Sequence, residues 1–184
     1  KPIGQNFEYQ WSQHAAKLTP EGDLFLFDNG NNKSKNLKDY TPAKNSYSRG
    51  VLYKINTTSM TVEQLWQYGK ERGSDFYSPY ISDVDYLEKD HYLVHSGGIV
   101  KSNGEPSNQP AGLTAGNVTL FSDTVEIKNN RVIFELLAPT NNYRVEKMNI
   151  YAGTNFTINS AKHLGTLWKT EINDKKQGFI TDTD

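Results

Sequence analysis

Two histidines are the residues of this sequence best suited to nucleophilic chemistry, because a neutral imidazole is a good nucleophile and its unperturbed pKa is ~6.5. His14 lies in the segment Gln13-His-Ala-Ala16, where small neighbours leave the ring accessible. His95 lies beside a glycine pair in His95-Ser-Gly-Gly98. A single histidine in a strand is more often a packed or surface residue than a catalyst. The residue pattern alone therefore leaves a structural role open for both histidines.

Three polar residues that follow His14 could contribute to an anion-binding site. Asn29, in the turn Asp28-Asn-Gly30, could donate to a ligand or only shape the turn. Lys33 is a candidate cation in a polar loop, where a solvated lysine is the alternative. Arg49 begins a predicted strand, and a surface arginine is its alternative. Cations and hydrogen-bond donors of this kind are what negative charge on a reacting group requires.

The sequence predicts no metal site and no cofactor. His91 and His95 are four residues apart, which places both on one face of a strand, but no third ligand is evident nearby. The chain has no cysteine, and its acidic triplets at 83–85 and 182–184 do not follow the calcium-loop pattern. A phosphate-binding Gly-Lys-Ser/Thr loop is also absent from the sequence.

Short apolar runs between turn residues predict strands along most of the chain. The first group of predicted strands is 12–18, 23–28, 49–55 and 61–68. The second group is 81–87, 91–96, 118–121, 124–128, 132–137 and 143–151. We therefore predict an all-β fold with almost no helix and two consecutive four-stranded antiparallel sheets, each typical of a propeller blade or of a sandwich sheet. We expect the following residues to be buried: Val51, Tyr53, Val132, Phe134 and Leu136.

The composition is that of a rather polar single domain. The 184 residues are 35% hydrophobic, with a mean hydropathy of -0.72 and 12% aromatic residues, a bias that suits strands. The net charge of -1 does not favour binding to nucleic acid or to an anionic membrane. No apolar run approaches the ~20 residues that span a bilayer. The chain begins at Lys1-Pro2-Ile3 without a signal peptide, which we interpret as an excised piece.

Several segments together resemble the bacterial arylsulfate sulfotransferases, which need no nucleotide sulfate donor. The resemblance begins at Trp11-Ser-Gln-His-Ala15 and continues through Leu26-Phe-Asp-Asn-Gly30 and Tyr47-Ser-Arg-Gly-Val-Leu-Tyr-Lys-Ile55. The most specific part is 64–79, within Met60-Thr-Val-Glu-Gln-Leu-Trp-Gln-Tyr-Gly-Lys-Glu-Arg-Gly73 and Phe76-Tyr-Ser-Pro79. It fades near Tyr143-Arg-Val145.

The resemblance implies a fold, a reaction and a location. It implies that residues 1–184 are the C-terminal portion of a six-bladed β-propeller, with about two blades at 12–68 and 81–151 followed by a tail. It implies aryl sulfate and phenol as small-molecule partners, no cofactor, and a periplasmic or extracellular location. Two blades do not close a propeller, so exposed edges allow association with other copies of the chain in a homo-oligomer.

The resemblance also assigns roles to the candidate residues. It implies that a histidine beside the glycine pair, here His95, takes up the sulfuryl group as sulfohistidine. His14 is then a catalytic residue that stabilises charge, and it is the alternative nucleophile. The arginine of the family that follows the Asp-Asn-Gly turn is replaced here by Lys33 or Lys35, with Asn29 and Arg49 as further substrate-binding candidates.

A non-catalytic propeller fragment or β-rich binding module is the alternative function. Tyrosine and tryptophan side chains in its loops would then bind sugars or a partner strand. The enzyme requires further blades in the parent protein, whereas a binding module does not.

Overall fold

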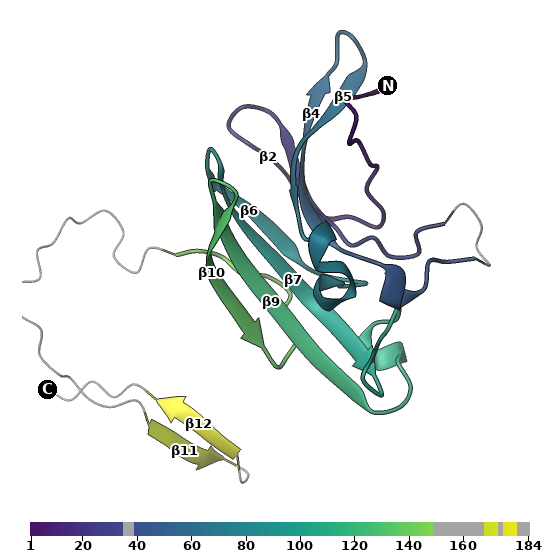
Figure 1. The fold of residues 1–184 in the computed structure, drawn as a ribbon. Helices are drawn as coiled ribbons and strands as arrows, with labels where there is room; N and C mark the ends of the chain where they lie inside the picture. The colour runs from purple at the N-terminus through teal and green to yellow at the C-terminus, as the bar shows by residue number, and fades with distance from the viewer. Residues whose placement is uncertain (35–38, 149–167, 173–174, 180–184) are drawn as a thin grey trace, which may run out of the picture. The chain divides into compact units, whose positions relative to one another are not determined.

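The computed structural model describes residues 1–34, 39–148, 168–172 and 175–179 (Figure 1). These residues form an all-β structure, and the helices among them are three short 3-10 segments. The 3-10 segments are η1 (Ala43–Asn45), η2 (Lys70–Phe76) and η3 (Ala111–Leu113). The chain divides into two compact units, Lys1–Lys147 and Met148–Asp184. In the part that the structure describes, no helix has both the length and the apolar character that a membrane crossing requires.

The first sheet of the larger unit has the strand order β1-β5-β4-β3-β2. Its neighbours are antiparallel, except that β1 runs parallel to β5. The turn between β2 and β3 closes with a hydrogen bond from Gly22 N to Thr19 O, and Gly22 has a φ of 83°. Its strands are β1 (Pro2–Ile3), β2 (His14–Leu18), β3 (Leu24–Asp28), β4 (Arg49–Asn56) and β5 (Thr61–Tyr68).

The second sheet has the order β10-β9-β7-β6, with the short β8 paired to β7. Its longest turn-linked pair, β9 and β10, is joined by Asn129 and Asn130, whose φ angles of 50° and 59° are those a two-residue hairpin needs. Its strands are β6 (Asp83–Glu88), β7 (His91–Ser102), β8 (Glu105–Pro106), β9 (Val118–Lys128) and β10 (Arg131–Ala138).

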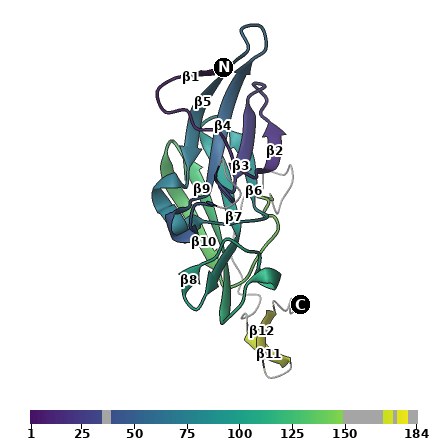
Figure 2. The same ribbon diagram turned by 90° about the vertical axis from the view of Figure 1, so that its right-hand side faces the viewer.

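The two sheets pack against each other through a shared core (Figure 2). Side chains alternate along β3, so that Phe25 and Phe27 enter this core while Leu26 joins a smaller cluster on the opposite face. A Cβ atom at Gly50 on β4 would lie 2.8 Å from a methyl group of Val94 on β7, so glycine at this position permits the close approach of the sheets. The core consists of Phe25, Phe27, Leu52, Phe76, Val84, Tyr92, Val94, Val125 and Ile127.

The predicted all-β class and near-absence of helix are confirmed, and the predicted four-stranded sheets are extended by short additional strands. β1 and β8 make each sheet five-stranded. The two predicted strands at 118–121 and 124–128 are one continuous strand, β9. The strand predicted at 143–151 is wrong for residues 143–148, which form no strand, and its remaining residues lie outside the described part.

Burial of Val51 and Tyr53 is confirmed, but the burial predicted for β10 is wrong. Val132, Phe134 and Leu136 are 45%, 49% and 53% exposed. The physical reason is that β10 is the outermost strand of its sheet and pairs only with β9. The apolar run 132–137 therefore lies on an exposed edge strand. The first sheet packs against the inner strands of the second sheet and does not cover the side chains of β10.

The smaller unit contains one described element, an antiparallel hairpin. It pairs β11 (Trp168–Ile172) with β12 (Lys175–Phe179).

A matched pair of substitutions measures what the shared core contributes. Phe25→Ala removes a fully buried ring that contacts Trp66 and Tyr92, and we expect a loss of about 3–5 kcal/mol in the free energy of unfolding. Phe134→Ala makes the same chemical change on the half-exposed edge strand, and we expect a loss under ~1 kcal/mol. Urea unfolding of the chain measures both. Equal losses would contradict the assignment of the core to the interface between the sheets.

Candidate functional site

His14 is presented by an irregularity at the start of β2. The pairing of β2 with β3 shifts between His14 and Lys17, because two residues of β2 stand opposite Leu26. Ala15 at this bulge has a φ of 52°, and Ser12 just before it has a φ of 57°. Bulges re-aim side chains and are frequent next to active sites, and a non-glycine residue at positive φ costs on the order of 1–3 kcal/mol. The chain therefore maintains a strained backbone on both sides of His14.

The imidazole of His14 is held through one of its two ring nitrogens. Its Nδ1 lies 2.6 Å from Oδ1 of Asn29, and the residue is half-buried. Among the described residues, none forms a hydrogen bond with Nε2. A ring held in this way has a fixed orientation and keeps one nitrogen for a ligand.

Asn29 is completely buried, and both polar atoms of its side chain are engaged. Its Nδ2 donates to the backbone oxygens of Ser78, at 2.8 Å, and Ile81, at 2.9 Å. Its backbone oxygen accepts a hydrogen bond of 2.7 Å from the Ser48 hydroxyl. Because both donors of the amide are used within the chain, the structure places Asn29 as a support of His14.

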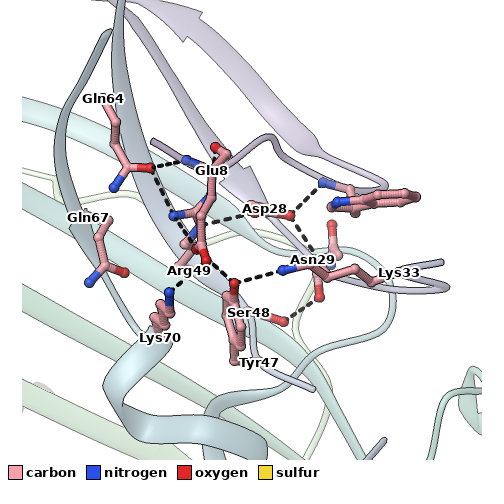
Figure 3. Close-up of polar contacts among 12 residues, drawn as sticks. Glu8, Asp28, Asn29, Lys33, Tyr47, Ser48, Arg49, Gln64, Gln67 and Lys70 are labelled. Atoms are coloured by element: carbon pink, nitrogen blue, oxygen red, sulfur yellow. Dashed lines mark hydrogen bonds and ion pairs between the residues drawn. The ribbon is translucent and has the colours of Figure 1, made fainter. Parts of the chain in front are cut away.

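Arg49 is fully buried and lies within an internal polar network (Figure 3). Its Nε donates to Oδ2 of Asp28 at 3.0 Å, and its Nη1 donates to Oε1 of Gln64 at 3.0 Å. The other oxygen of Asp28 accepts the backbone N–H groups of Trp11, at 2.8 Å, and Gly30, at 3.0 Å. Arg49 thus stabilises the carboxylate that ties the segment before His14 to the turn after Asn29.

Glu8 of the N-terminal arm is the second carboxylate of this network. Its oxygens contact Lys70 at 2.7 Å, Tyr47 at 2.8 Å and Arg49 at 3.4 Å. Burial opposes its ionisation, but the hydrogen bonds from Lys70 and Tyr47 outweigh burial and keep the pKa of Glu8 below its usual value. A polar hollow of about 550 Å³ borders these groups. Glu8 is thus a second carboxylate, after Asp28, that contacts the guanidinium of Arg49.

Lys33 contacts the same network through Tyr47. Its Nζ lies 2.8 Å from the Tyr47 hydroxyl and 4.7 Å from the centre of the ring. Burial, together with the bond to Glu8, raises the pKa of Tyr47 to about 12, so this hydroxyl remains a donor. The structure thus brings Lys33 and Arg49 together around Glu8. Lys35 lies outside the described residues.

His95 lies inside the second sheet with both ring nitrogens engaged. It is 1% exposed, and its Nε2 donates to the backbone oxygen of Asn142 at 3.0 Å. Since a carbonyl only accepts, Nδ1 carries the lone pair and accepts from the Thr124 hydroxyl at 2.9 Å. Burial lowers the pKa of His95, which keeps the ring neutral. In this arrangement the lone pair of His95 is directed at a neighbouring residue.

His91, which the sequence places on the same strand face as His95, forms hydrogen bonds to two carboxylates. His91 contacts Glu88 at 3.1 Å and Glu126 at 2.6 Å. Within the described ranges, no three acidic, histidine or cysteine side chains are grouped as metal ligands.

Sequence reasoning missed the groups that hold the site together. Ser78 and Ile81 act through backbone oxygens, which leave no side-chain signal in a sequence. Glu8 precedes the first predicted strand, and its role depends on Arg49, which begins a strand some forty residues later in the sequence. The polar turn Asp28-Asn29-Gly30 was the signal in the sequence that could have revealed these contacts. A carboxylate and an amide at the end of a buried strand need hydrogen-bond partners.

Comparison with known proteins identifies the class to which this fold and site belong. A family profile described as arylsulfotransferase (ASST) matches residues 1–151, and the chain belongs to this family. It is 44% identical over 95 residues to the arylsulfate sulfotransferase AssT of Lelliottia amnigena, covering 51% of this chain and 16% of that protein. It is 39% identical over 95 residues to AssT of Escherichia coli O6:H1 (strain CFT073), covering 52% of this chain and 16% of that protein. The match therefore spans about a sixth of each relative.

Removing Arg49 tests the importance of the buried ion pair. Arg49→Met leaves Asp28 as an unpaired buried charge, and we expect a loss of about 3–5 kcal/mol in the free energy of unfolding. Adding Asp28→Asn removes that charge and should recover part of the loss, with a coupling of roughly 0.5–3 kcal/mol. Arg131→Met, at an exposed arginine, is the control and should change stability by about 0.5 kcal/mol or less. Strict additivity of the two substitutions would contradict the pairing.

Proposed function

We propose that this chain forms part of the active site of an arylsulfate sulfotransferase, which transfers a sulfuryl group from a phenolic sulfate ester to a phenolic acceptor. Membership of the arylsulfotransferase family supports the reaction class. The two relatives are arylsulfate sulfotransferases, which supports an aryl sulfate as the donor. The observation that carries the proposal is His14, whose ring is anchored through Nδ1 while Nε2 has no partner among the described residues.

We further propose that His14 carries the sulfuryl group, in place of His95. Covalent catalysis needs a lone pair that a substrate can reach. His95 is buried and its lone pair faces Thr124, whereas His14 is half-buried beside a strained bulge. His95 then contributes to the packing of the second sheet, and it holds the segment at Asn142.

The proposed reaction has two steps. Nε2 of His14 attacks the sulfur of the donor, the bond from sulfur to the aryl oxygen breaks, and the phenolate leaves with the electron pair. The oxygen of a second phenol then attacks the sulfur of sulfohistidine, the nitrogen–sulfur bond breaks with its electron pair returning to Nε2, and the proton of the acceptor passes through solvent to the phenolate released in the first step. The imidazole is regenerated neutral, and no nucleotide or metal enters the balance.

The charge on the sulfuryl oxygens needs donors beyond those at His14. Arg49 is paired with Asp28, Lys33 is bonded to Tyr47, and both donors of Asn29 are used by backbone oxygens. We therefore propose that the donors come from parts of a longer protein. This agrees with the match to about a sixth of each relative.

The architecture fits this arrangement. We propose that the two sheets are adjacent blades in the C-terminal portion of a β-propeller, because each contains a four-stranded antiparallel path and the sheets pack on a shared core. The apolar edge strand β10 would then meet another blade or another copy of the chain. We place the enzyme in the periplasm or outside the cell, as the resemblance to bacterial sulfotransferases implies.

The carrier is tested in the full-length protein by following both turnover and labelling. His14→Ala should reduce turnover of an aryl sulfate by on the order of 10⁴ or more, because it removes the nucleophile. Mass analysis of the wild-type protein, quenched after donor alone, should locate one sulfuryl group on the peptide that contains His14. His95→Gln is the control and should keep the label. A label on the His95 peptide, with turnover preserved in His14→Ala, would return the carrier role to His95.

The 184-residue chain alone should be a poor catalyst. Each missing donor to developing charge costs ~2.7–4 kcal/mol, or about 10²–10³ in rate. The assay is release of a coloured phenol from an aryl sulfate with a phenol acceptor, compared with the full-length protein. Turnover equal to that of the full-length protein would show that the donors lie within this chain or are supplied by its self-association.

A further inference from the structure

We infer that residues 139–147 form a removable cover over His95, and that Asn142 is the latch that keeps this cover closed. These residues, named the strap here, follow β10 and form no helix or strand. While the strap is closed, both ring nitrogens of His95 are engaged and the residue is 1% exposed. When the strap opens, Nε2 becomes accessible. The inference goes beyond the proposed function, because its test needs no sulfuryl transfer.

Asn142 holds the strap on the second sheet with three hydrogen bonds. Its N–H donates to the backbone oxygen of Gly97 at 3.0 Å, and its backbone oxygen accepts from Nε2 of His95 at 3.0 Å. Its Nδ2 donates to the Ser122 hydroxyl at 2.8 Å. Since Gly97 and His95 lie on β7 and Ser122 lies on β9, this one residue fastens the strap to two neighbouring strands.

Gly97 permits the strap to lie this close to the sheet. A Cβ atom at this position would lie 2.1 Å from the backbone oxygen of Asn142 and 3.0 Å from Nε2 of His95. Non-bonded heavy atoms pack at roughly 3.5–4.0 Å, so a side chain at this position would displace the strap from the ring. The first glycine after His95 thus fits the closed position of the strap.

The contacts of the strap on either side of the latch are few. Before the latch, Asn141 donates a hydrogen bond to the Tyr80 hydroxyl. In the half that follows the latch, Val145 is partly buried and the other side chains are exposed, with Lys147 bonded to Glu126 at 2.5 Å. A hollow of about 230 Å³ lies between this half and the side chains of β9 and β10. Segments with few buried apolar contacts open locally at a lower free-energy cost than the whole fold, so the strap can open while both sheets stay intact.

Thr124 can support the ring of His95 in either tautomer, because a hydroxyl both donates and accepts. In the closed position Nε2 carries the hydrogen that the Asn142 oxygen accepts, so Nδ1 accepts from Thr124. Once the strap moves, Nδ1 can carry the hydrogen and donate it to the same hydroxyl, which leaves the lone pair on Nε2. Opening therefore changes both the exposure of the ring and the nitrogen that can react.

The cover is tested by the rate at which diethyl pyrocarbonate modifies each histidine of the 184-residue chain near neutral pH. An imidazole lone pair attacks a carbonyl carbon of the reagent, and the released half yields ethanol and carbon dioxide. Mass analysis of the peptides reports His95 and His14 separately in one sample. We expect His95 to react at least about 10-fold more slowly than the half-buried His14, because it reacts only from the open state. Equal rates in the wild-type chain would overturn the inference.

Loosening the latch should release His95 alone. Asn142→Gly removes the hydrogen bond to Ser122 and adds backbone freedom, so the rate at His95 should rise by about 10-fold while the rate at His14 stays the same. Thr140→Gly is the matched control, because it adds the same freedom at an exposed strap residue whose hydroxyl bonds to its neighbour in the chain. An equal rise in both variants would refute the role of Asn142.

A second variant acts on the latch from the sheet. Ser122→Ala deletes the hydroxyl that accepts from Asn142 and leaves the strap sequence intact, so the rate at His95 should rise by about 3–10-fold. Ser102→Ala is its control, because this serine lies seven residues beyond His95 on β7 and donates to the backbone oxygen of Ala115. If Asn142→Gly unfolds the chain, both histidines react faster and Ser122→Ala decides. An unchanged rate at His95 in a folded Ser122→Ala chain would overturn the inference.

The closed tautomer can be measured in the wild-type chain by NMR of isotope-labelled imidazole nitrogens. The chain has four histidines, and His95→Gln identifies the signals of His95 by their loss. We expect the pattern of the Nε2–H tautomer, because the backbone oxygen of Asn142 only accepts. An Nδ1–H pattern would show that this oxygen is not bonded to the ring, and it would overturn the latch without any change to the strap.

Discussion

The buried amide of Asn29 is the interaction on which the arrangement of the site depends. An amide without contact with water must satisfy its donors and its acceptor within the protein. The donors of Asn29 use carbonyls from the loop that enters the second sheet, and its acceptor meets the ring of His14 in the first sheet. One side chain thereby links the start of β2 to the loop that precedes β6, so a change in the packing of the two sheets would alter the position of the imidazole.

The ion pair of Arg49 and Asp28 supports the same region from the other side. Buried charges are costly and stabilise a fold mainly when every remaining donor and acceptor has a partner. Asp28 accepts from Arg49, Trp11 and Gly30, so its charge is spread over contacts that fix the chain on both sides of the site. The network therefore fixes the conformation of the segment from Trp11 to His14. The guanidinium of Arg49 is used within this network and is not directed at a ligand.

Local patterns predicted the strands well, because the side-chain period and the turn residues are written into short stretches of sequence. Burial on β10 and the environment of His95 could not be predicted in this way. Whether Phe134 is covered depends on which strand ends the sheet, and His95 is enclosed by Asn142, which is distant in sequence. Accessibility of His14 was predictable from its small neighbours, whereas the tautomer depends on backbone oxygens that no residue type reveals.

The chemistry explains why an amide suits this position better than a carboxylate. In a hydrolase triad the histidine takes a proton from the nucleophile, so a carboxylate that stabilises imidazolium helps the reaction. In the proposed transfer His14 is itself the nucleophile, and the leaving phenolate needs no proton from it. Stabilising imidazolium would lower the share of rings that carry a free lone pair before the attack. A neutral acceptor that fixes Nδ1–H aims the lone pair of Nε2, and it leaves the imidazole free of an adjacent negative charge that would favour protonation.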